Sequence, residues 1–364
     1  MKGSRRSEGK KNMNKLKILL TFDHELPLGG LNTSFHKALF EPTNKLLDIA
    51  ELLDVKINLF TDILCALKFK TWDYEGFYLP YINQIKQTLL KNNDVQLHLH
   101  PHWLTTEFKG DNYFPSSDFK LADFRNKSSP ENIEGVIFKG YSTLTNICKH
   151  YKNDYNCIAY RAGGYNLEPC AKEILTWLYK AGIRIDSSIS KGYYYRSALN
   201  KVDYFNMPSA PNWFIGLDGA LHKAAKEGIY EIPISSKPKS LFEKPTSLKL
   251  KKYSFRAPEN HGRQIHEGKP AGYIYKIKQA FSSRMLSFDN YTYSSEYLMS
   301  ILNYNIEKYK NFETVILSVI SHPKSMSDYS FLLMKKFIEM AREKYTDKIE
   351  FTTYSNIYKE LALC

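Results

Sequence analysis

The stretch KILLTFDHE, residues 17–25, is an apolar run that ends in an aspartate, a histidine and a glutamate. A short run rich in Ile, Leu and Phe is typical of a buried β-strand. Residues two apart on an extended backbone share a face, so Asp23 and Glu25 are expected to converge while His24 points away. Taken alone, such acids fit a helix N-cap or a turn equally well. Together with the strand, they predict a pair of acids at its carboxyl end.

Seven further runs of the same kind follow along the chain. They lie at residues 55–60, 95–100, 158–161, 183–185, 231–235, 315–320 and 349–352. Between most of them, stretches with helical spacing occur at residues 42–53, 79–91, 131–150, 168–181 and 329–344. This alternation predicts an α/β fold with a parallel sheet. The number of strands favours a distorted (β/α) barrel of seven or eight strands.

The length of 364 residues is enough for one enlarged domain, and 43% hydrophobic residues are ordinary for a globular protein. We expect a disordered basic tail over residues 1–15 and a single barrel domain over residues 16–364. Residues 192–293 break the alternation with sequence rich in Tyr and Lys, which predicts an elaborated insertion around the strand at 231–235.

The formal net charge is +13, and the excess of Lys and Arg is concentrated in the tail and in residues 237–278. Such charge is typical of proteins that bind nucleic acid, an anionic membrane surface or acidic glycans. A solvated face explains it equally well.

Five cysteines, an odd number with no CxxC pair, argue against a disulfide framework and for a reducing compartment. The apolar run at residues 16–22 is far shorter than a bilayer span and lacks a small-residue cleavage site. With neither a secretion signal nor a transmembrane segment in evidence, the sequence predicts a cytoplasmic protein, with peripheral membrane contact left open.

Three histidines, His98, His100 and His102, lie within five residues at the end of a predicted strand that Pro101 interrupts. Neutral imidazole is a common zinc ligand, and two histidines with one carboxylate form a recurring catalytic zinc site. The cluster therefore predicts a metal centre near the two acids.

Polar residues follow three other strands. Arg161 precedes two glycines and Tyr165, a pattern that allows a close backbone approach to a ligand and an oxyanion site at Gly164 and Tyr165. Asp186 and His322 also come directly after predicted strands, and a histidine held by a carboxylate is a good general acid. Active sites of α/β barrels lie at this end of the strands.

In this order, the motifs resemble those of the NodB-homology polysaccharide deacetylases, carbohydrate esterase family four. The resemblance runs from about residue 17 to 325 and leaves the basic insertion unmatched. The family's motifs, a TFDD-like segment, HxxxH, RxxxY, a later aspartate and a final strand with histidine, correspond to residues 21–25, His98 with His102, Arg161 with Tyr165, Asp186, and residues 317–322.

The resemblance implies that Glu25, His98 and His102 hold one divalent ion, with zinc expected and cobalt or nickel as substitutes. One departure concerns the family's second aspartate, which is His24 here. Either Glu25 or His24 therefore completes the metal site, and His100 is a further alternative ligand.

The resemblance also implies that Asp23 acts as base, held by Arg161, and that His322 acts as acid, oriented by Asp186. The backbone amide near Tyr165 would stabilise the oxyanion. The expected reaction is removal of an N-acetyl group from a sugar.

The text TFDHEL with HLHPHW is similar to a sub-branch from bacterial surface-polysaccharide (O-antigen) biosynthesis. This similarity implies a carbohydrate substrate. The basic insertion suggests that the substrate is anionic or linked to a lipid or nucleotide, and no nucleic acid is expected. Two alternatives stay open. One is a hydrolase of another non-peptide C–N bond on the same metal site, and the other is a catalytically inactive protein that binds glycans or nucleic acid.

Overall fold

A computed structural model describes residues 15–110, 112–239 and 273–363. At its centre a ten-stranded sheet follows the order β11-β10-β12-β7-β6-β3-β2-β1-β15, and β16 also pairs with β1. The strands are β1 (Lys15–His24), β2 (Ile57–Asp62), β3 (Asp94–Leu99), β6 (Ala159–Ala162), β7 (Ile185–Asp186), β10 (Trp213–Ile215), β11 (Ala224–Ala225), β12 (Ile229–Glu231), β15 (Thr314–Ser321) and β16 (Ile349–Phe351).

The parallel part of this sheet curls until its two sides meet. From β12 through β7, β6, β3, β2 and β1 to β15, every neighbouring pair is parallel. Beyond β12, Ile234 forms a bridge to Ser190 on one side and to Ser318 of β15 on the other. The described residues thus form a ring of these seven strands. The predicted α/β fold and distorted (β/α) barrel are confirmed.

Each predicted apolar run overlaps a strand, but the last run does not enter the ring. Strand β16 pairs only with β1, beside the start of that strand, where Leu16 faces Ile349. The five predicted helices correspond to α1 (Glu41–Leu52), α3 (Leu79–Leu90), α4 (Ile133–Tyr151), α5 (Ala171–Ala181) and α9 (Asp328–Tyr345). The sequence did not predict α2 (Ile63–Trp72), α7 (Tyr273–Phe281), α8 (Ser295–Lys308) or α10 (Tyr354–Glu360).

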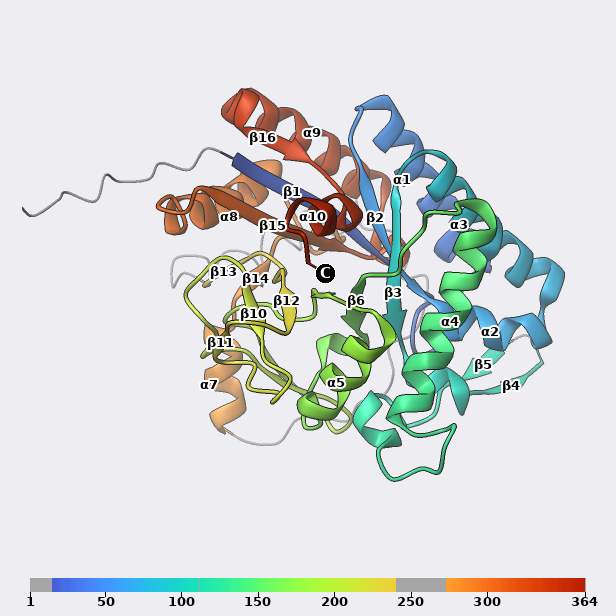
Figure 1. The fold of residues 1–364 in the computed structure, drawn as a ribbon. Coiled ribbons are helices and arrows are strands. Elements are labelled where there is room, and N and C mark those ends of the chain that lie inside the picture. Colours follow the sequence, from blue (N-terminus) through green and yellow to red (C-terminus); the bar gives the residue numbers. More distant parts are fainter. Residues whose placement is uncertain (1–14, 111, 240–272, 364) are drawn as a thin grey trace, which may run out of the picture.

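Helices surround the ring (Figure 1). Apolar faces of α2, α3, α4 and α5 contribute to one large buried cluster, and those of α1, α8 and α9 pack with β1 and β15 in a second. Helix α10 lies over the middle of the ring in Figure 1. Its Tyr354 is fully buried and donates a hydrogen bond to Ser187 Oγ (2.8 Å), while its backbone N–H donates to Asn58 Oδ1 near the start of β2. Helix α10 therefore covers the amino end of the ring.

The predicted insertion is described only in part. Its described segments carry the hairpin of β8 (Tyr194–Arg196) and β9 (Lys201–Asp203), the strands β10 to β12, and the pair of β13 (Ser236–Lys237) and β14 (Arg284–Met285). A second hairpin of β4 (Glu107–Lys109) and β5 (Asn112–Phe114) lies elsewhere, before α4. Most of the basic segment and nearly all of the predicted tail lie outside the described residues.

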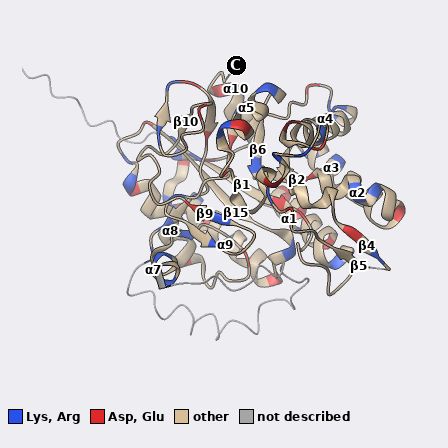
Figure 2. Ribbon diagram, turned by 90° about the horizontal axis from the view of Figure 1, so that it is seen from below, with Lys and Arg blue, Asp and Glu red and all other residues tan. Residues whose placement is uncertain are grey.

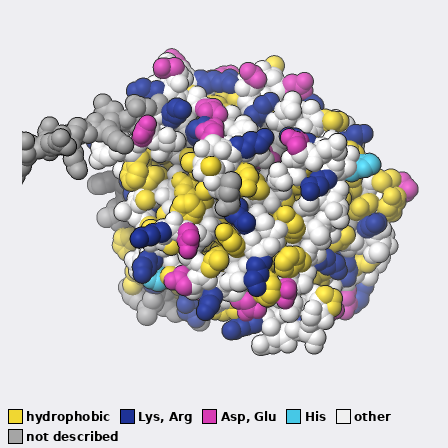
Figure 3. Space-filling model, in the orientation of Figure 1, with side chains coloured by type: hydrophobic (Ala, Val, Ile, Leu, Met, Phe, Trp, Pro, Cys, Tyr) yellow, Lys and Arg dark blue, Asp and Glu magenta, His cyan; other side chains and the backbone are white. Residues whose placement is uncertain are grey.

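Lys and Arg are spread over many elements of the described chain (Figure 2), and on the face shown in Figure 3 they alternate with apolar and acidic side chains. In the described ranges, each helix is too short or too polar to pass through a bilayer.

The register of the parallel strands decides which side chains meet. Across three neighbouring strands, Asp62 is the partner of His98, and His98 is the partner of Arg161. On the other side of β1, Phe22 is the partner of Ser321 in β15. The next residues on the two strands, Asp23 and His322, therefore lie side by side. The predicted polar residues thus gather at the carboxyl end of the ring.

Candidate functional site

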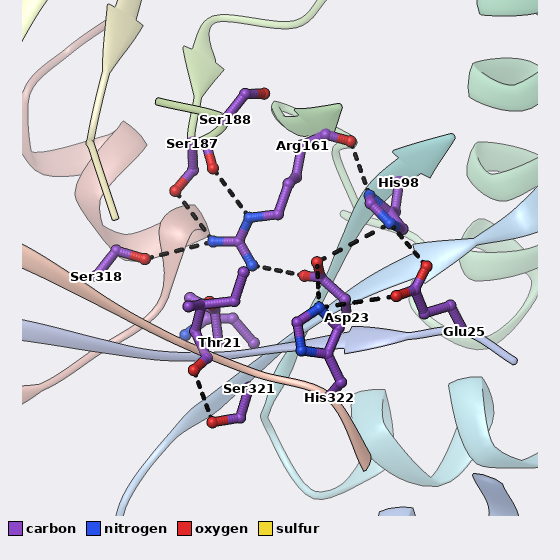
Figure 4. A network of polar contacts seen from close by, with 12 residues as sticks. Thr21, Asp23, Glu25, His98, Arg161, Ser187, Ser188, Ser318, Ser321 and His322 are labelled. Carbon is purple, nitrogen blue, oxygen red and sulfur yellow. Dashed lines mark hydrogen bonds and ion pairs between the residues drawn. The ribbon is translucent and has the colours of Figure 1, made fainter. Parts of the chain in front are cut away.

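Asp23 and Arg161 form a buried ion pair inside the ring. Arg161 Nη1 lies 2.6 Å from Asp23 Oδ1, and both side chains are almost fully buried. Arg161 also donates from Nε to the carbonyl oxygen of Ser187 (2.9 Å), and its guanidinium lies 4.1 Å from the centre of the Phe60 ring. Figure 4 shows the polar contacts from Asp23, Ser187 and Ser318 converging on the guanidinium. Because every part of Arg161 is held, it fixes the orientation of the Asp23 carboxylate.

Glu25 meets two histidines of the predicted cluster. Its Oε2 lies 3.3 Å from His98 Nε2 and 2.5 Å from His100 Nε2. His98 Nδ1 lies 2.8 Å from the carbonyl oxygen of Arg161, which can only accept, so this nitrogen carries a hydrogen and Nε2 faces the carboxylates. Such second contacts fix the tautomer of metal-binding histidines.

The charge on His98 reflects the acids around it. Burial alone would lower its pKa, but Asp23 and Glu25 raise the pKa of His98 to about 9. A proton on Nε2 therefore links this ring to both carboxylates. A metal ion bound here would displace that proton.

His102 does not join this group, although the sequence predicted it as a ligand. It lies in the 3-10 turn Pro101–Leu104, stacked near Phe119, and neither ring nitrogen has a hydrogen-bond partner. His100 instead has an extended backbone and continues the line of β3, so it shares a face with His98. The ligand atoms of Glu25, His98 and His100 lie within 4.8 Å of one another, so the geometry favours His100 over His102, and the predicted role of His102 as a ligand stays a prediction.

His24 points away from the site, as the alternation on β1 predicts. Its Nε2 lies 2.8 Å from Gln84 Oε1, and its ring packs 4.4 Å from that of Tyr81. Burial lowers the pKa of His24 to about 4. The alternative in which His24 completes the metal site is wrong, because its side chain lies on the opposite face of the strand.

His322 faces both acids from the end of β15. Its Nε2 lies 3.6 Å from Asp23 Oδ2, 3.7 Å from Glu25 Oε1 and 3.3 Å from the Tyr165 hydroxyl. Its Nδ1 lies 2.8 Å from Asp289 Oδ2, and its backbone N–H donates to the other oxygen of that carboxylate. Burial would lower the pKa of His322, but Asp289 raises it above its ordinary value.

Asp186 is not the partner of His322, and that prediction is wrong. Its side chain accepts hydrogen bonds from the backbone N–H (3.0 Å) and the hydroxyl (2.8 Å) of Ser188, and it also contacts Glu231. The reason is the alternation on β7: Ser187 directs its hydroxyl to Arg161, so the neighbouring Asp186 faces the other side.

Gly164 and Tyr165 form a left-handed turn after β6, with φ near +61° and +60°. A Cβ atom at Gly164 would lie 2.6 Å from the Phe119 ring, so the turn has room only for glycine. The Tyr165 hydroxyl thereby reaches His322. The oxyanion role predicted for the amide of this turn stays a prediction.

Among solved structures, the chain is similar to a peptidoglycan N-acetylglucosamine deacetylase from Eubacterium rectale, at 11% identity and a TM-score of 0.39 over 96% of this chain and 92% of that one. It is also similar to an allantoinase (10%, 0.47, over 97% and 91%). A branching enzyme from Thermococcus kodakaraensis matches as well (9%, 0.49, over 95% and 71%). No family model and no curated protein matches the chain. Because these structures differ in activity, the likeness selects no function.

The residues present fit a divalent metal ion. One carboxylate and two imidazoles form a donor set that zinc accepts, and Nε2 of both His98 and His100 faces Glu25 Oε2. Asp23, Glu25 and His322 form a second, overlapping group of candidate ligands. The described chain thus offers two neighbouring arrangements that share Glu25.

Sequence reasoning missed Asp289 and Lys324. The ammonium group of Lys324 lies 2.8 Å from Glu25 Oε1 and donates to the carbonyl oxygen of Leu26 (3.0 Å). Burial alone would raise the pKa of Glu25, but Lys324 and His100 hold it well below its ordinary value. The position of Lys324 two residues after His322 was a usable signal, since it follows the same strand.

Proposed function

We propose that this chain is a metal-dependent hydrolase that removes an N-acetyl group from an amino sugar in a polysaccharide or its biosynthetic precursor. The observation that carries the proposal is the pairing of a base with an acid beside a metal-ligand set. Asp23, fixed by Arg161, lies 3.6 Å from His322, fixed by Asp289, and Glu25 with its two histidines adjoins both. A base and an acid this close can act on the two sides of one scissile bond.

A divalent ion held by Glu25, His98 and His100 would supply Lewis-acid assistance at the acetamide carbonyl. We assign zinc from the ligand types, with cobalt or nickel as substitutes. The residues of the chain carry the proton transfers. Asp23 accepts a proton from the attacking water, whose oxygen bonds to the acetyl carbon.

The leaving amine needs a proton when the C–N bond breaks. His322 supplies it, because Asp289 raises the pKa of His322, which favours the protonated ring. The products are acetate and a free amino sugar. We propose that the backbone amide near Tyr165 donates to the oxyanion, in the manner of preorganised backbone donors. The left-handed turn after β6 supports this proposal.

We further propose that residues 16–364 form one catalytic domain that works in the cytoplasm on a precursor of a bacterial surface polysaccharide. The cysteines are consistent with a reducing compartment, since the four described ones are free and buried. An anionic or carrier-linked sugar suits the basic composition.

The first test is metal content, measured by elemental analysis on wild type and on single alanine variants of His98, His100 and His102. We expect about one ion per chain in wild type, its loss in His98→Ala and His100→Ala, and retention in His102→Ala. His36→Ala is the matched control, because this exposed histidine lies outside the candidate set. A wild-type chain that binds no divalent ion after reconstitution would contradict the proposal.

The second test is acetate release from N-acetylated sugars. Asp23→Asn is expected to retain the ion and to lose activity by roughly 10²- to 10⁴-fold, the usual contribution of a positioned base. A panel that includes small amides separates the sugar deacetylase from a hydrolase of other C–N bonds. Hydrolysis of small amides alone would refute the sugar substrate, and binding of glycans without hydrolysis would refute the enzyme.

A further inference from the structure

A cavity lies on the outer side of the ring, against β15 and the segment that follows β12. It has a volume of about 400 Å³, within the range of small-molecule sites. Its walls come from the segments at 191–192, 205–211 and 233–238, from the end of α8, and from Leu317 of β15. None of the candidate metal or catalytic residues lines it.

Two lysines line this cavity, and no acid is among its described lining residues. Lys191 donates hydrogen bonds to the carbonyl oxygens of Pro208 (2.7 Å) and Ala210 and to the Tyr309 hydroxyl (3.2 Å). Its ammonium group also lies 4.7 Å from the Trp213 ring. These three hydrogen bonds use all the N–H groups of a Lys191 ammonium, so Lys191 would act on a ligand through its charge and not through a further hydrogen bond.

Lys308, at the end of α8, has no ion pair in the described part of the chain, and its ammonium group lies 5.2 Å from the Tyr309 ring. Burial and the charge of Lys308 lower the pKa of Lys191 to about 7. Glu231, which does not line the cavity, would raise the pKa of Lys191 if it were charged. Burial raises the pKa of Glu231 well above the ordinary value, which favours its neutral form. An anion in the cavity would relieve the repulsion between the two lysines.

The Ser235 hydroxyl is a second, independent sign of a ligand. Ser235 lines the cavity, is only 4% exposed, and its Oγ has no hydrogen-bond partner. Its backbone N–H is already paired with Ser318, so only the hydroxyl is available. A buried hydroxyl without a partner costs free energy that a bound oxygen atom would recover.

The rest of the wall is largely apolar and contains rigid rings, although Ser209, Ser236, Ser283 and Asn305 also line it. Prolines and aromatic residues dominate it, namely Pro208, Pro211, Pro233, Pro238, Phe205, Phe281 and Tyr304. Flat, inflexible surfaces of this kind suit the body of a ring-shaped molecule, whereas the lysines and Ser235 suit an anionic group. The two parts together fit one ligand.

We propose that this cavity binds a small phosphorylated, ring-shaped molecule, with its phosphate toward Lys308, Lys191 and the Ser235 hydroxyl. The site is separate from the metal centre and does not depend on the proposed hydrolase activity. A bound phosphate would favour the protonated form of Lys191, and two ammonium groups then match the charge of a phosphate monoester. The cavity thus gives the chain a second ligand besides any substrate.

The test is isothermal titration calorimetry on the full chain, freed of metal with a chelator so that phosphate cannot bind to an ion. The probes are glucose 1-phosphate, inorganic phosphate and glucose. We expect saturable binding of glucose 1-phosphate, weaker binding of inorganic phosphate because it lacks the ring, and no binding of glucose. Equal binding of glucose and glucose 1-phosphate would overturn the proposal.

Variants locate the binding. Lys308→Met should weaken glucose 1-phosphate binding by about tenfold or more, and Ser235→Ala should weaken it several-fold without a large change in side-chain volume. Lys310→Met is the matched control. It removes the same charge only two residues along the chain, and Lys310 lies on the surface, where it pairs with Glu307. Equal losses in Lys308→Met and Lys310→Met would show general surface attraction and sink the assignment, as would wild-type affinity in Ser235→Ala.

Discussion

Glu25 and Glu231 are both glutamates buried at the carboxyl ends of ring strands, yet their surroundings have opposite effects on their charge. Glu25 contacts Lys324 and two histidines, which hold its pKa well below the ordinary value. Glu231 meets Asp186, and burial together with that neighbour raises the pKa of Glu231 well above the ordinary value. A buried acid therefore becomes a candidate ligand only where the fold also supplies cations.

The same contrast separates two aspartates, Asp186 at the end of β7 and Asp289 in the loop after β14. Asp289 contacts the imidazole of His322, whereas Asp186 belongs with Glu231 and Ser188. Burial raises the pKa of Asp186, which favours its neutral form. The comparison assigns chemistry to the Glu25 region and packing to the Glu231 region.

The sharpest way to break the comparison is to exchange the two aspartates for asparagine. Asp289→Asn should lower kcat on the order of 10²-fold, because His322 loses the carboxylate that orients it and keeps it protonated. Asp186→Asn should leave kcat within a few-fold of wild type. Acetate release measured across pH checks both, and the acidic role of His322 predicts that the alkaline limb moves to lower pH in Asp289→Asn only. An equal loss in both variants would contradict the division of the two regions.

A second prediction removes the cation beside Glu25. Lys324→Met should strengthen zinc binding on the order of tenfold. In wild type, the Glu25 carboxylate must give up its charged hydrogen bond with Lys324 to bind the ion, and the variant removes this cost. Competition with a chromophoric chelator measures the affinity without any need for activity. Lys310→Met serves as the control with the same loss of charge. Weaker zinc binding in Lys324→Met would mean that the lysine orients Glu25 rather than competes for it.

The smallest expected effect concerns stability in the Glu231 region. Glu231 has a raised pKa in the folded chain, so its contribution to stability is complete below about pH 4 and is lost as pH rises through the folded pKa. Glu231→Gln cannot ionise and should therefore gain stability relative to wild type as pH rises, on the order of 1 kcal/mol. Thermal unfolding at a series of pH values measures this difference. The exposed Glu307→Gln is the control, and a difference that shrinks with rising pH would refute the assignment.

Most of the ring could be predicted from the sequence because its strands are short, apolar and separated by amphipathic helices. Helix α2 could not, since four of its first five residues, Ile63–Ala66, and also Phe69 are buried, so the segment lacks the polar face that marks a helix. Strand β16 has the apolar pattern of a ring strand. Its exclusion from the ring follows from its single pairing, with β1, which the sequence pattern does not specify.

The candidate site divides in the same way. Asp23, Glu25, Arg161 and His322 were predictable because each follows an apolar run that becomes a ring strand. Asp289 was not, since it lies 33 residues before its partner in a loop without periodicity. The choice of His100 over His102 depended on where the extended backbone gives way to a turn at Pro101, which the spacing of three histidines does not specify.

Helix α10 has a consequence for the traffic of molecules. With Tyr354 buried at the amino end of the ring and bonded to Ser187, helix α10 closes that end behind the polar cluster. Under the proposed function, substrate would therefore have to approach the cluster from the carboxyl side of the ring. Product would have to leave on that same side before the next molecule could bind.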